Sequence, residues 1–175
     1  ADFIAICRAC AEVSIKLIVV PLVDNGSLEL QEQEDIFISF MLAQADLFRL
    51  LGLRIIFESD FAPCKLARFI GRLPTDTFGI NYDIGNSAAL GYNPDEEFAA
   101  YSSRIVNVHV KDRVLGGSTV PLGTGNADFP KVFRLLHEAS YAGYLILQTA
   151  RSEYGNHAGA LYNYIEQIEA WRNRN

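Results

Sequence analysis

Short apolar runs alternate with longer amphipathic stretches along the chain, and this alternation restricts the fold more than any other feature. Runs rich in branched aliphatic side chains predict buried strands at residues 17–23, 54–57, 78–82, 105–110 and 144–147. Apolar residues spaced by three and four predict helices at residues 3–13, 32–51, 63–71, 94–102, 130–139 and 158–172. Strand–helix alternation without hairpin signals indicates βαβ units, and hence an α/β fold with a parallel sheet.

A polar residue stands at or near the end of each apolar run, and these residues favour a barrel over an open sheet. They are Asp24, Glu58, Asp83, His109 and Gln148. A (β/α)8 TIM barrel gathers the carboxyl ends of its strands at one face, whereas an open sheet spreads them along a line. Such a barrel needs eight strands, and only about five are visible here. We therefore interpret residues 1–175 as the C-terminal part of a single TIM-barrel domain, strands 4 to 8, with the N-terminal strands absent.

The composition restricts the class of partner and the compartment. A net charge of −6 and a pI near 5 argue against a nucleic-acid-binding surface. The richest apolar stretch, residues 36–57, contains three charged residues, so we expect no membrane span. Three cysteines without framework spacing indicate a reducing cytoplasm. Cys7 and Cys10 form a C-x-x-C within a helical pattern, where we expect small buried side chains rather than a metal or redox site.

The spacing of four strand-end residues predicts a metal site. Glu58, Asp83 and His109 follow one another at intervals of 25 and 26 residues, the length of one strand–helix unit. The interval to Gln148 is longer because a Gly-rich loop at residues 116–125 intervenes. Each residue alone is also compatible with a helix cap or a satisfied polar group. In register, their mixed oxygen and nitrogen atoms suit Mn²⁺, Mg²⁺, Co²⁺ or Zn²⁺.

Three blocks of the sequence resemble the xylose-isomerase-like superfamily, with its sugar-phosphate isomerases and epimerases as the closest branch. They read F-E-S-D at residues 57–60, N-Y-D-I-G-N at residues 81–86 and H-V-K-D-R at residues 109–113, and the segments 121–129 and 144–151 are similar to later blocks. By that resemblance Glu58, Asp83 and His109 match three of four metal ligands, on barrel strands five to seven. Gln148 stands on the eighth strand at the fourth position, which is usually Glu.

The resemblance implies a metal-dependent isomerase or epimerase that acts on a sugar or sugar phosphate through an enediolate. In that family the first and last glutamates, here Glu58 and Gln148, move protons at neighbouring carbons. A glutamine offers a carbonyl oxygen to a metal but accepts no proton near neutral pH. Three outcomes therefore stay open: Glu58 acts as a single base, Asp60 or His157 supplies the second proton transfer, or the activity is lost or changed.

Further residues near these blocks are candidates for substrate binding. Lys111, Arg113 and Arg151 are expected to bind an anionic end of the substrate, although an internal ion pair for Lys111 and a solvated Arg113 are the plainer alternatives. Asp24 is expected to contact sugar hydroxyls or to cap the next helix, and Asn86 to make a substrate or structural contact. The Gly-rich loop could hold a phosphate through its backbone N–H groups.

The expected partner is a small-molecule sugar or sugar phosphate, and assembly into a homo-oligomer is left open. Two other functions compete with the isomerase. One is a metal-dependent hydrolase like endonuclease IV, which the small number of histidines and the acidic charge disfavour. The other is a non-catalytic sugar-binding or truncated barrel, which Gln148 and the missing strands favour.

Overall fold

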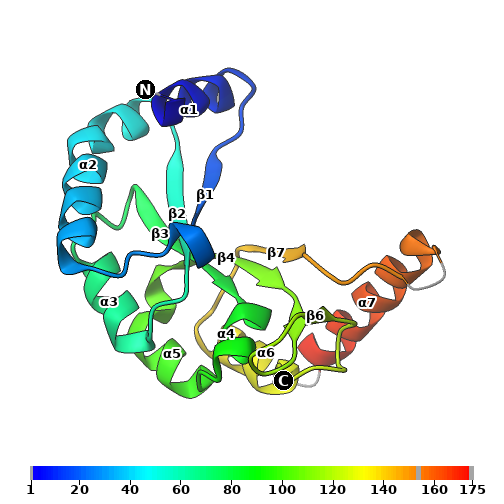
Figure 1. Cartoon of the computed structure of the whole chain (residues 1–175). Helices are drawn as coiled ribbons and strands as arrows, with labels where there is room; N and C mark the ends of the chain where they lie inside the picture. The colour runs from blue at the N-terminus through cyan, green and yellow to red at the C-terminus, as the bar shows by residue number, and fades with distance from the viewer. Residues whose placement is uncertain (1, 153–154, 174–175) are drawn as a thin grey trace. The chain divides into compact units, whose positions relative to one another are not determined.

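The computed structural model describes residues 2–152 and 155–173, and its main sheet has five strands in the order β1-β2-β3-β4-β7 (Figure 1). The sheet pairs in parallel where β1 meets β2, where β2 meets β3 and where β4 meets β7. The expected α/β fold with five strands is confirmed. The strands span Leu17–Leu22 (β1), Arg54–Ser59 (β2), Phe78–Asp83 (β3), Ile105–Val110 (β4) and Tyr144–Leu147 (β7).

The helices that the sequence predicts are present, with ends that differ by at most one residue. They span Asp2–Glu12 (α1), Gln31–Leu50 (α2), Pro63–Gly71 (α3), Pro94–Tyr101 (α5), Phe129–Glu138 (α6) and His157–Arg172 (α7). None of the described helices is long and apolar enough to cross a membrane.

Three short features were not predicted. Helix α4 (Ile84–Leu90) directly follows β3, and its small residues gave no amphipathic pattern. Strands β5 (Asp112–Arg113) and β6 (Thr119–Val120) form an antiparallel pair, and two residues are too few to show an alternation. Two 3₁₀ turns, at Asp24–Gly26 and Ser102–Arg104, precede α2 and β4.

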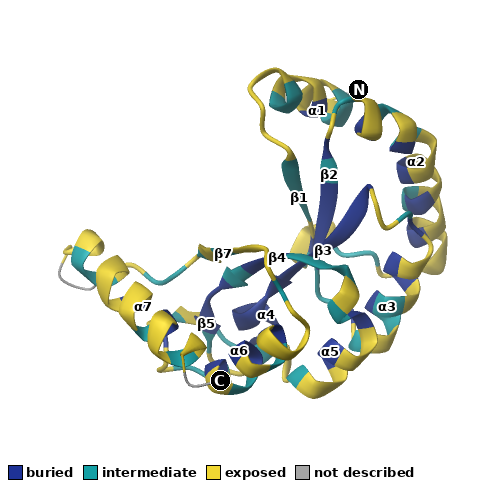
Figure 2. Cartoon of the chain, turned by 180° about the vertical axis from the view of Figure 1, so that it is seen from behind, coloured by how far each residue is buried: buried dark blue, intermediate teal, exposed yellow. Residues whose placement is uncertain are grey.

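The chain divides into two compact units, Ala1–Asn81 and Tyr82–Asn175. Aromatic side chains build the core of the first unit. Phe57 of β2 lies 5.6 Å from Phe37 of α2, 5.4 Å from Phe69 of α3 and 6.1 Å from Phe78 of β3, measured between ring centroids. Figure 2 shows β2 buried along most of its length. Burial of this much aromatic surface is a main source of stability for such a unit.

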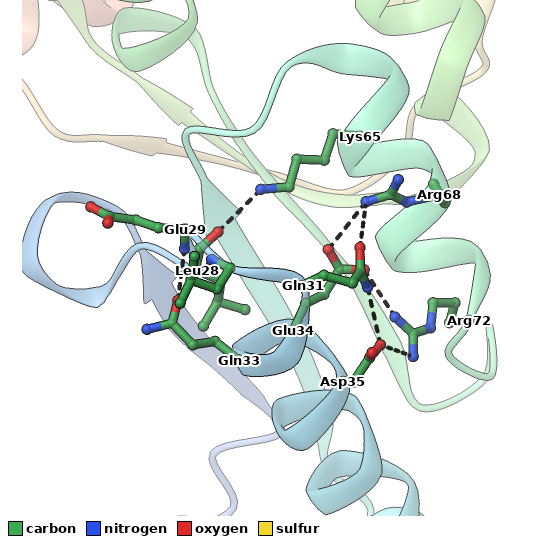
Figure 3. Close-up of polar contacts among 10 residues, drawn as sticks. Leu28, Glu29, Gln31, Gln33, Glu34, Asp35, Lys65, Arg68 and Arg72 are labelled. Carbon is green, nitrogen blue, oxygen red and sulfur yellow. Dashed lines mark hydrogen bonds and ion pairs between the residues drawn. The ribbon is translucent and has the colours of Figure 1, made fainter.

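A charged cluster joins α2 to α3 within the first unit (Figure 3). The Glu34 carboxylate is buried and pairs with Arg68 at 3.3 Å and with Arg72 at 3.0 Å. Lys65 of α3 also donates a hydrogen bond of 3.1 Å to the Leu28 carbonyl oxygen, just before α2. Because a buried carboxylate needs charged or polar partners, the two arginines fix where α3 packs on α2.

The C-x-x-C motif lies in α1, as expected. Cys7 is buried and Cys10 is half-buried, and both are free thiols. Burial raises the pKa of the Cys7 thiol, with the neighbouring Cys10 as a second cause. The thiol of Cys7 is therefore even more fully protonated at neutral pH than an ordinary cysteine.

In the second unit, a ring stack and a buried carboxylate organise the packing. Phe129 of α6 stacks on Trp171 of α7 with ring centroids 4.4 Å apart. Glu97 of α5 is buried and accepts hydrogen bonds from the hydroxyl groups of Tyr82 at 2.9 Å and Tyr101 at 2.7 Å. These contacts tie α5 to the end of β3, where the candidate site begins.

Candidate metal centre

Asp83 ends β3 and begins α4. Its side chain is buried, and its Oδ1 atom accepts a hydrogen bond of 2.8 Å from the backbone N–H of Asn86. Asp83 is thus the N-cap of α4, which satisfies one of the free amide groups at the start of that helix. The plain alternative considered for a strand-end acid, a helix cap, holds for this oxygen.

The second carboxylate oxygen of Asp83 has a different environment. Oδ2 is buried and accepts no hydrogen bond of good geometry. The Lys111 ammonium lies 2.8 Å from it and His109 Nδ1 lies 3.6 Å from it. The ion pair with Lys111 is therefore close but poorly aligned. A buried carboxylate oxygen without a hydrogen bond is costly, and a cation held by the same oxygen would remove that cost.

His109 and Lys111 both lie close to Asp83 in the second unit. His109 is near the end of β4, and Lys111 follows the strand by one residue. Side chains two residues apart in an extended segment point to the same face, so the H-x-K spacing brings the imidazole and the ammonium group together. Both side chains are largely buried, with 12% and 11% of their surface exposed.

Gly85 makes the close approach of Lys111 possible. A Cβ atom at Gly85 would lie 2.8 Å from Lys111 Cγ and 3.0 Å from its carbonyl carbon and oxygen. Backbone atoms cannot move aside easily, so a larger residue would push Lys111 away from Asp83. The glycine of the N-Y-D-I-G-N block therefore has a packing role next to the candidate site.

Gln148 follows β7 and reaches the same group of side chains. Its backbone N–H donates a hydrogen bond of 3.1 Å to the carbonyl oxygen of Val110, the residue before Lys111. Its side-chain Oε1 accepts a hydrogen bond of 2.8 Å from the Lys111 ammonium. Lys111 therefore lies between Asp83 and Gln148, which confirms the plainer alternative of an internal ion pair for this lysine.

Glu58 lies in the first unit, one residue before the end of β2, and is buried. Its carboxylate accepts a hydrogen bond of 2.9 Å from the side-chain amide of Asn81 on β3. The register, in which Phe57 pairs with Ile80, places Asn81 beside Glu58. Asn81 was not predicted as a site residue. A usable signal was present, because Asn81 is a polar residue inside an apolar strand and stands two positions before Asp83.

Asn86 and Arg113 bind each other. Arg113 donates a hydrogen bond of 2.9 Å to Asn86 Oδ1 and two more, of 3.0 and 2.6 Å, to the carbonyl oxygen of Gly117. The guanidinium group therefore joins α4 to the turn between β5 and β6. This is the structural contact considered for Asn86, and substrate binding by either residue stays a prediction.

The Gly-rich loop surrounds a carboxylate of the protein itself. The backbone N–H groups of Gly123 and Gly125 donate to Asp112 Oδ2 at 2.9 and 2.8 Å, and the N–H of Ala127 donates to Oδ1 at 3.1 Å. Asp112 is fully buried. The amide groups of Gly123 and Gly125 belong to the loop that was a candidate for holding a phosphate, and they are already used by Asp112.

Arg151 lies on the surface beyond β7. Together with Gln148 and His157 it lines a cavity of about 270 Å³. His157 Nδ1 accepts a hydrogen bond of 3.2 Å from the backbone N–H of Ser152, which leaves Nε2 as the protonated nitrogen of the neutral ring. Whether Arg151 binds an anion stays a prediction.

Asp24 opens the 3₁₀ turn after β1 and is exposed. Helix α2 begins at Gln31 with Leu30 as its N-cap, so Asp24 does not cap this helix. Contact with a sugar hydroxyl remains the prediction for Asp24. Asp60, one of the candidate second bases, accepts a hydrogen bond of 2.8 Å from the Ser27 hydroxyl in the same unit.

A known protein family matches almost the whole chain. The family model described as "Xylose isomerase-like TIM barrel" matches residues 1–174. The chain belongs to this family. The TIM-barrel class and the superfamily that the sequence resembles are thereby confirmed, with five strands of the barrel present in the chain.

Individual relatives match parts of the chain. L-ribulose-5-phosphate 3-epimerase UlaE of Salmonella paratyphi A is 42% identical over 71 residues, which are 39% of this chain and 25% of the relative. The IolI protein, solved with a zinc atom, has a TM-score of 0.81 at 16% identity over 99% of this chain and 68% of that one. A xylose isomerase domain protein from Planctomyces limnophilus has a TM-score of 0.79 at 17% identity over 97% and 62%. The match to the curated relative thus spans about a quarter of its length.

Proposed function

We propose that this chain is the C-terminal part of a TIM-barrel domain that catalyses the isomerisation or epimerisation of a sugar or sugar phosphate with a divalent metal ion, in the cytoplasm. The observation that carries the proposal is the buried Oδ2 atom of Asp83, which has no aligned hydrogen bond and lies 3.6 Å from a histidine nitrogen. An oxygen and a nitrogen so placed fit a divalent cation. Similarity to a sugar-phosphate epimerase supports the choice of reaction.

The ligands that we propose are Glu58, Asp83 and His109. Strand β3 carries Asp83 and, two residues earlier, Asn81, whose side-chain amide donates a hydrogen bond to Glu58. Residues two apart on a strand share a face. The mixed carboxylate and imidazole donors suit Zn²⁺, Mn²⁺, Co²⁺ or Mg²⁺, and the zinc atom in the IolI structure supports a metal at this fold.

Glu58 is the proposed base. Its carboxylate removes the proton from the carbon next to the sugar carbonyl, and the electron pair of that C–H bond moves onto the carbonyl oxygen. A divalent ion bound by the site would supply positive charge that stabilises the resulting negative oxygen. Glu58 gives an isomer when it delivers this proton to the neighbouring carbon and the adjacent hydroxyl group passes its own proton to the former carbonyl oxygen. An epimer requires a second group that donates a proton to the opposite face of the same carbon, while Glu58 keeps the proton that it removed. Asn81 positions Glu58 through its hydrogen bond.

A pair of aspartates provides a matched experiment for the metal site. Asp83 caps α4 and Asp128 caps α6, and in both residues Oδ1 accepts a backbone N–H. Asp128 is exposed, and its Oδ1 accepts the backbone N–H of Lys131. An asparagine keeps the capping oxygen at both positions and removes the charge. We expect Asp83→Asn to lower the affinity for Zn²⁺ or Mn²⁺ by about 100-fold or more, and Asp128→Asn to leave it unchanged.

Turnover is tested with the same proteins. The chain is incubated with metal and with L-ribulose or L-ribulose 5-phosphate in D₂O, and the loss of proton signal next to the carbonyl is followed by NMR. We expect exchange with the Asp128→Asn protein and none with Asp83→Asn or Glu58→Gln. Metal binding that is equal in the two aspartate variants would refute the site, and exchange that survives Glu58→Gln would refute the base.

A further inference from the structure

The side-chain oxygen of Gln148 is bound by Lys111, and this contact decides what the amide can do. We propose that Gln148 does not bind the metal ion but donates hydrogen bonds from its amide nitrogen to an oxygen of the sugar. This inference rests on the proposed function and assigns one residue within it. It replaces the expectation that Gln148 is the fourth metal ligand and the second catalytic residue.

The chemistry of the two groups fixes the orientation of the amide. A lysine ammonium group has hydrogen-bond donors and no acceptor. The atom of Gln148 that lies 2.8 Å from Lys111 Nζ must therefore be the carbonyl oxygen. That oxygen is also the atom by which a glutamine binds a metal ion, since the amide nitrogen carries two protons and has no available lone pair.

Packing around Lys111 keeps its ammonium group next to this oxygen. Its ammonium group lies 2.8 Å from Asp83 Oδ2, and its side chain is 11% exposed. Gly85 packs against its Cγ atom and its backbone. The backbone of Gln148 is fixed as well, through its hydrogen bond to Val110. The two residues are thus positioned independently of any ligand.

The other end of the amide is accessible. Gln148 is exposed, and it lines the cavity of about 270 Å³ that Arg151 and His157 also line. With the oxygen turned to Lys111, the –NH₂ group is left to interact on the other side. The two N–H donors can bind hydroxyl, carbonyl or enediolate oxygens of a sugar, but they cannot coordinate a metal ion. Gln148 is therefore a substrate-binding residue that the metal does not need.

This assignment leaves three protein ligands for the ion and one protein base. Glu58, Asp83 and His109 would hold the metal, and positions around it would remain for oxygens of the sugar. A glutamine cannot return a proton, so Glu58 would act alone or with a group other than Gln148. The proposal thus leaves two of the outcomes that the sequence left open, a single base at Glu58 or a second proton transfer by Asp60 or His157.

Gln148→Met tests the proposed role of the Gln148 amide. The substitution keeps the length of the side chain and removes both the oxygen and the amide donors. The affinity for Zn²⁺ without sugar is measured by calorimetry, and the binding of L-ribulose 5-phosphate is measured on the zinc-loaded protein. We expect Gln148→Met to change zinc affinity by less than about 3-fold and to weaken sugar binding by about 10-fold. Circular dichroism checks that the exposed substitution leaves the fold intact.

His109→Ala is the control that separates the two proposals. A loss of zinc affinity of about 100-fold in His109→Ala shows that the assay detects a missing ligand. If Gln148→Met then also loses 10-fold or more, Gln148 is a ligand and only this inference fails. If His109→Ala binds zinc as well as the wild-type chain, the proposed metal function fails. Sugar binding that is equal in wild type and Gln148→Met, or absent from both, overturns the donor role.

Discussion

Two buried aspartates of the second unit, Asp112 and Asp83, differ in how completely their carboxylate oxygens are hydrogen-bonded. Asp112 is fully buried, and three backbone N–H groups, two from the Gly-rich loop and one from Ala127 just after it, donate to its two oxygens. Asp83 has a backbone partner for Oδ1 alone, and its buried Oδ2 faces His109 and Lys111 without an aligned hydrogen bond. The first carboxylate is satisfied by the fold, and the second is satisfied only in part.

The difference separates a structural acid from a candidate ligand. A carboxylate with three charge-assisted hydrogen bonds stabilises the loop that supplies them and has little reason to bind anything else. A carboxylate whose second oxygen lies beside an imidazole and accepts no aligned hydrogen bond keeps the capacity to bind a metal ion. Both residues follow or end a strand in the sequence, so their position along the chain alone does not distinguish them. The location of nearby backbone amides does.

The largest effect on stability is expected at Asp112. In Asp112→Ala the N–H groups of Gly123, Gly125 and Ala127 lose their acceptor, and we expect the free energy of unfolding to fall by about 3–5 kcal/mol. Urea unfolding followed by circular dichroism measures this. The control is Asp128→Ala, which removes an exposed helix cap and should cost about 1 kcal/mol. Equal losses in the two variants would mean that the loop does not depend on Asp112.

The next effect concerns stabilisation by metal and is expected at Asp83. At a free Zn²⁺ concentration about 100 times the dissociation constant, the wild-type chain should gain about 2.7 kcal/mol of unfolding free energy. Asp83→Asn should gain almost none, because the charged oxygen beside His109 is replaced by an amide nitrogen. Unfolding in urea with and without zinc measures the gain. An undiminished gain in Asp83→Asn would place the bound zinc elsewhere in the chain.

A smaller effect is expected from crowding next to Asp83. In Gly85→Ala the new Cβ meets Lys111 atoms at 2.8–3.0 Å, and we expect a loss of about 2 kcal/mol as Lys111 shifts. Gly71→Ala is the matched control, since a Cβ at Gly71 meets nothing within 4 Å and its backbone needs no positive φ. That variant should be neutral or slightly stabilised. Similar losses in the two alanine variants would show that Lys111 is not tightly packed against Gly85.

Much of the architecture could be predicted because local pattern determines it. Branched apolar runs gave all five strands of the main sheet, and β4 and β7 have the predicted ends. Helix α4 could not be predicted, because its start depends on the Asp83 side chain capping it rather than on an apolar stripe. The pair β5–β6 depends on the loop closing around Asp112, which involves residues 11 to 15 positions apart.

The candidate site was predictable in its residues and not in their partners. Regular spacing identified Asp83 and His109, which the structure brings to within 3.6 Å of each other. The same spacing could not show that Lys111 binds both Asp83 and Gln148, because that contact depends on where a long flexible side chain turns. It also could not show that the amide groups of the Gly-rich loop are already occupied. The spacing of residues along the chain predicts where each backbone position lies on a strand. It does not predict which side chains are in contact, because packing determines those contacts.

A third buried acid, Glu97, extends the comparison and predicts the smallest effect. Its carboxylate is satisfied by hydroxyl groups of Tyr82, Ser87 and Tyr101 rather than by charges, and burial raises its pKa.

A raised pKa means that the folded chain keeps this proton to a higher pH than the unfolded chain, in which a glutamate titrates near about 4.3. The stability that the protonated group contributes is thus complete below that pH and is lost as the pH rises through the folded pKa. The slope from one such proton is at most about 1.4 kcal/mol per pH unit. Glu97→Gln should abolish this part of the pH dependence as the pH rises above about 4.3, whereas exposed Glu138→Gln should leave it as in wild type. Urea unfolding across this pH range measures both, and a wild-type slope that persists in Glu97→Gln would assign the proton to another group.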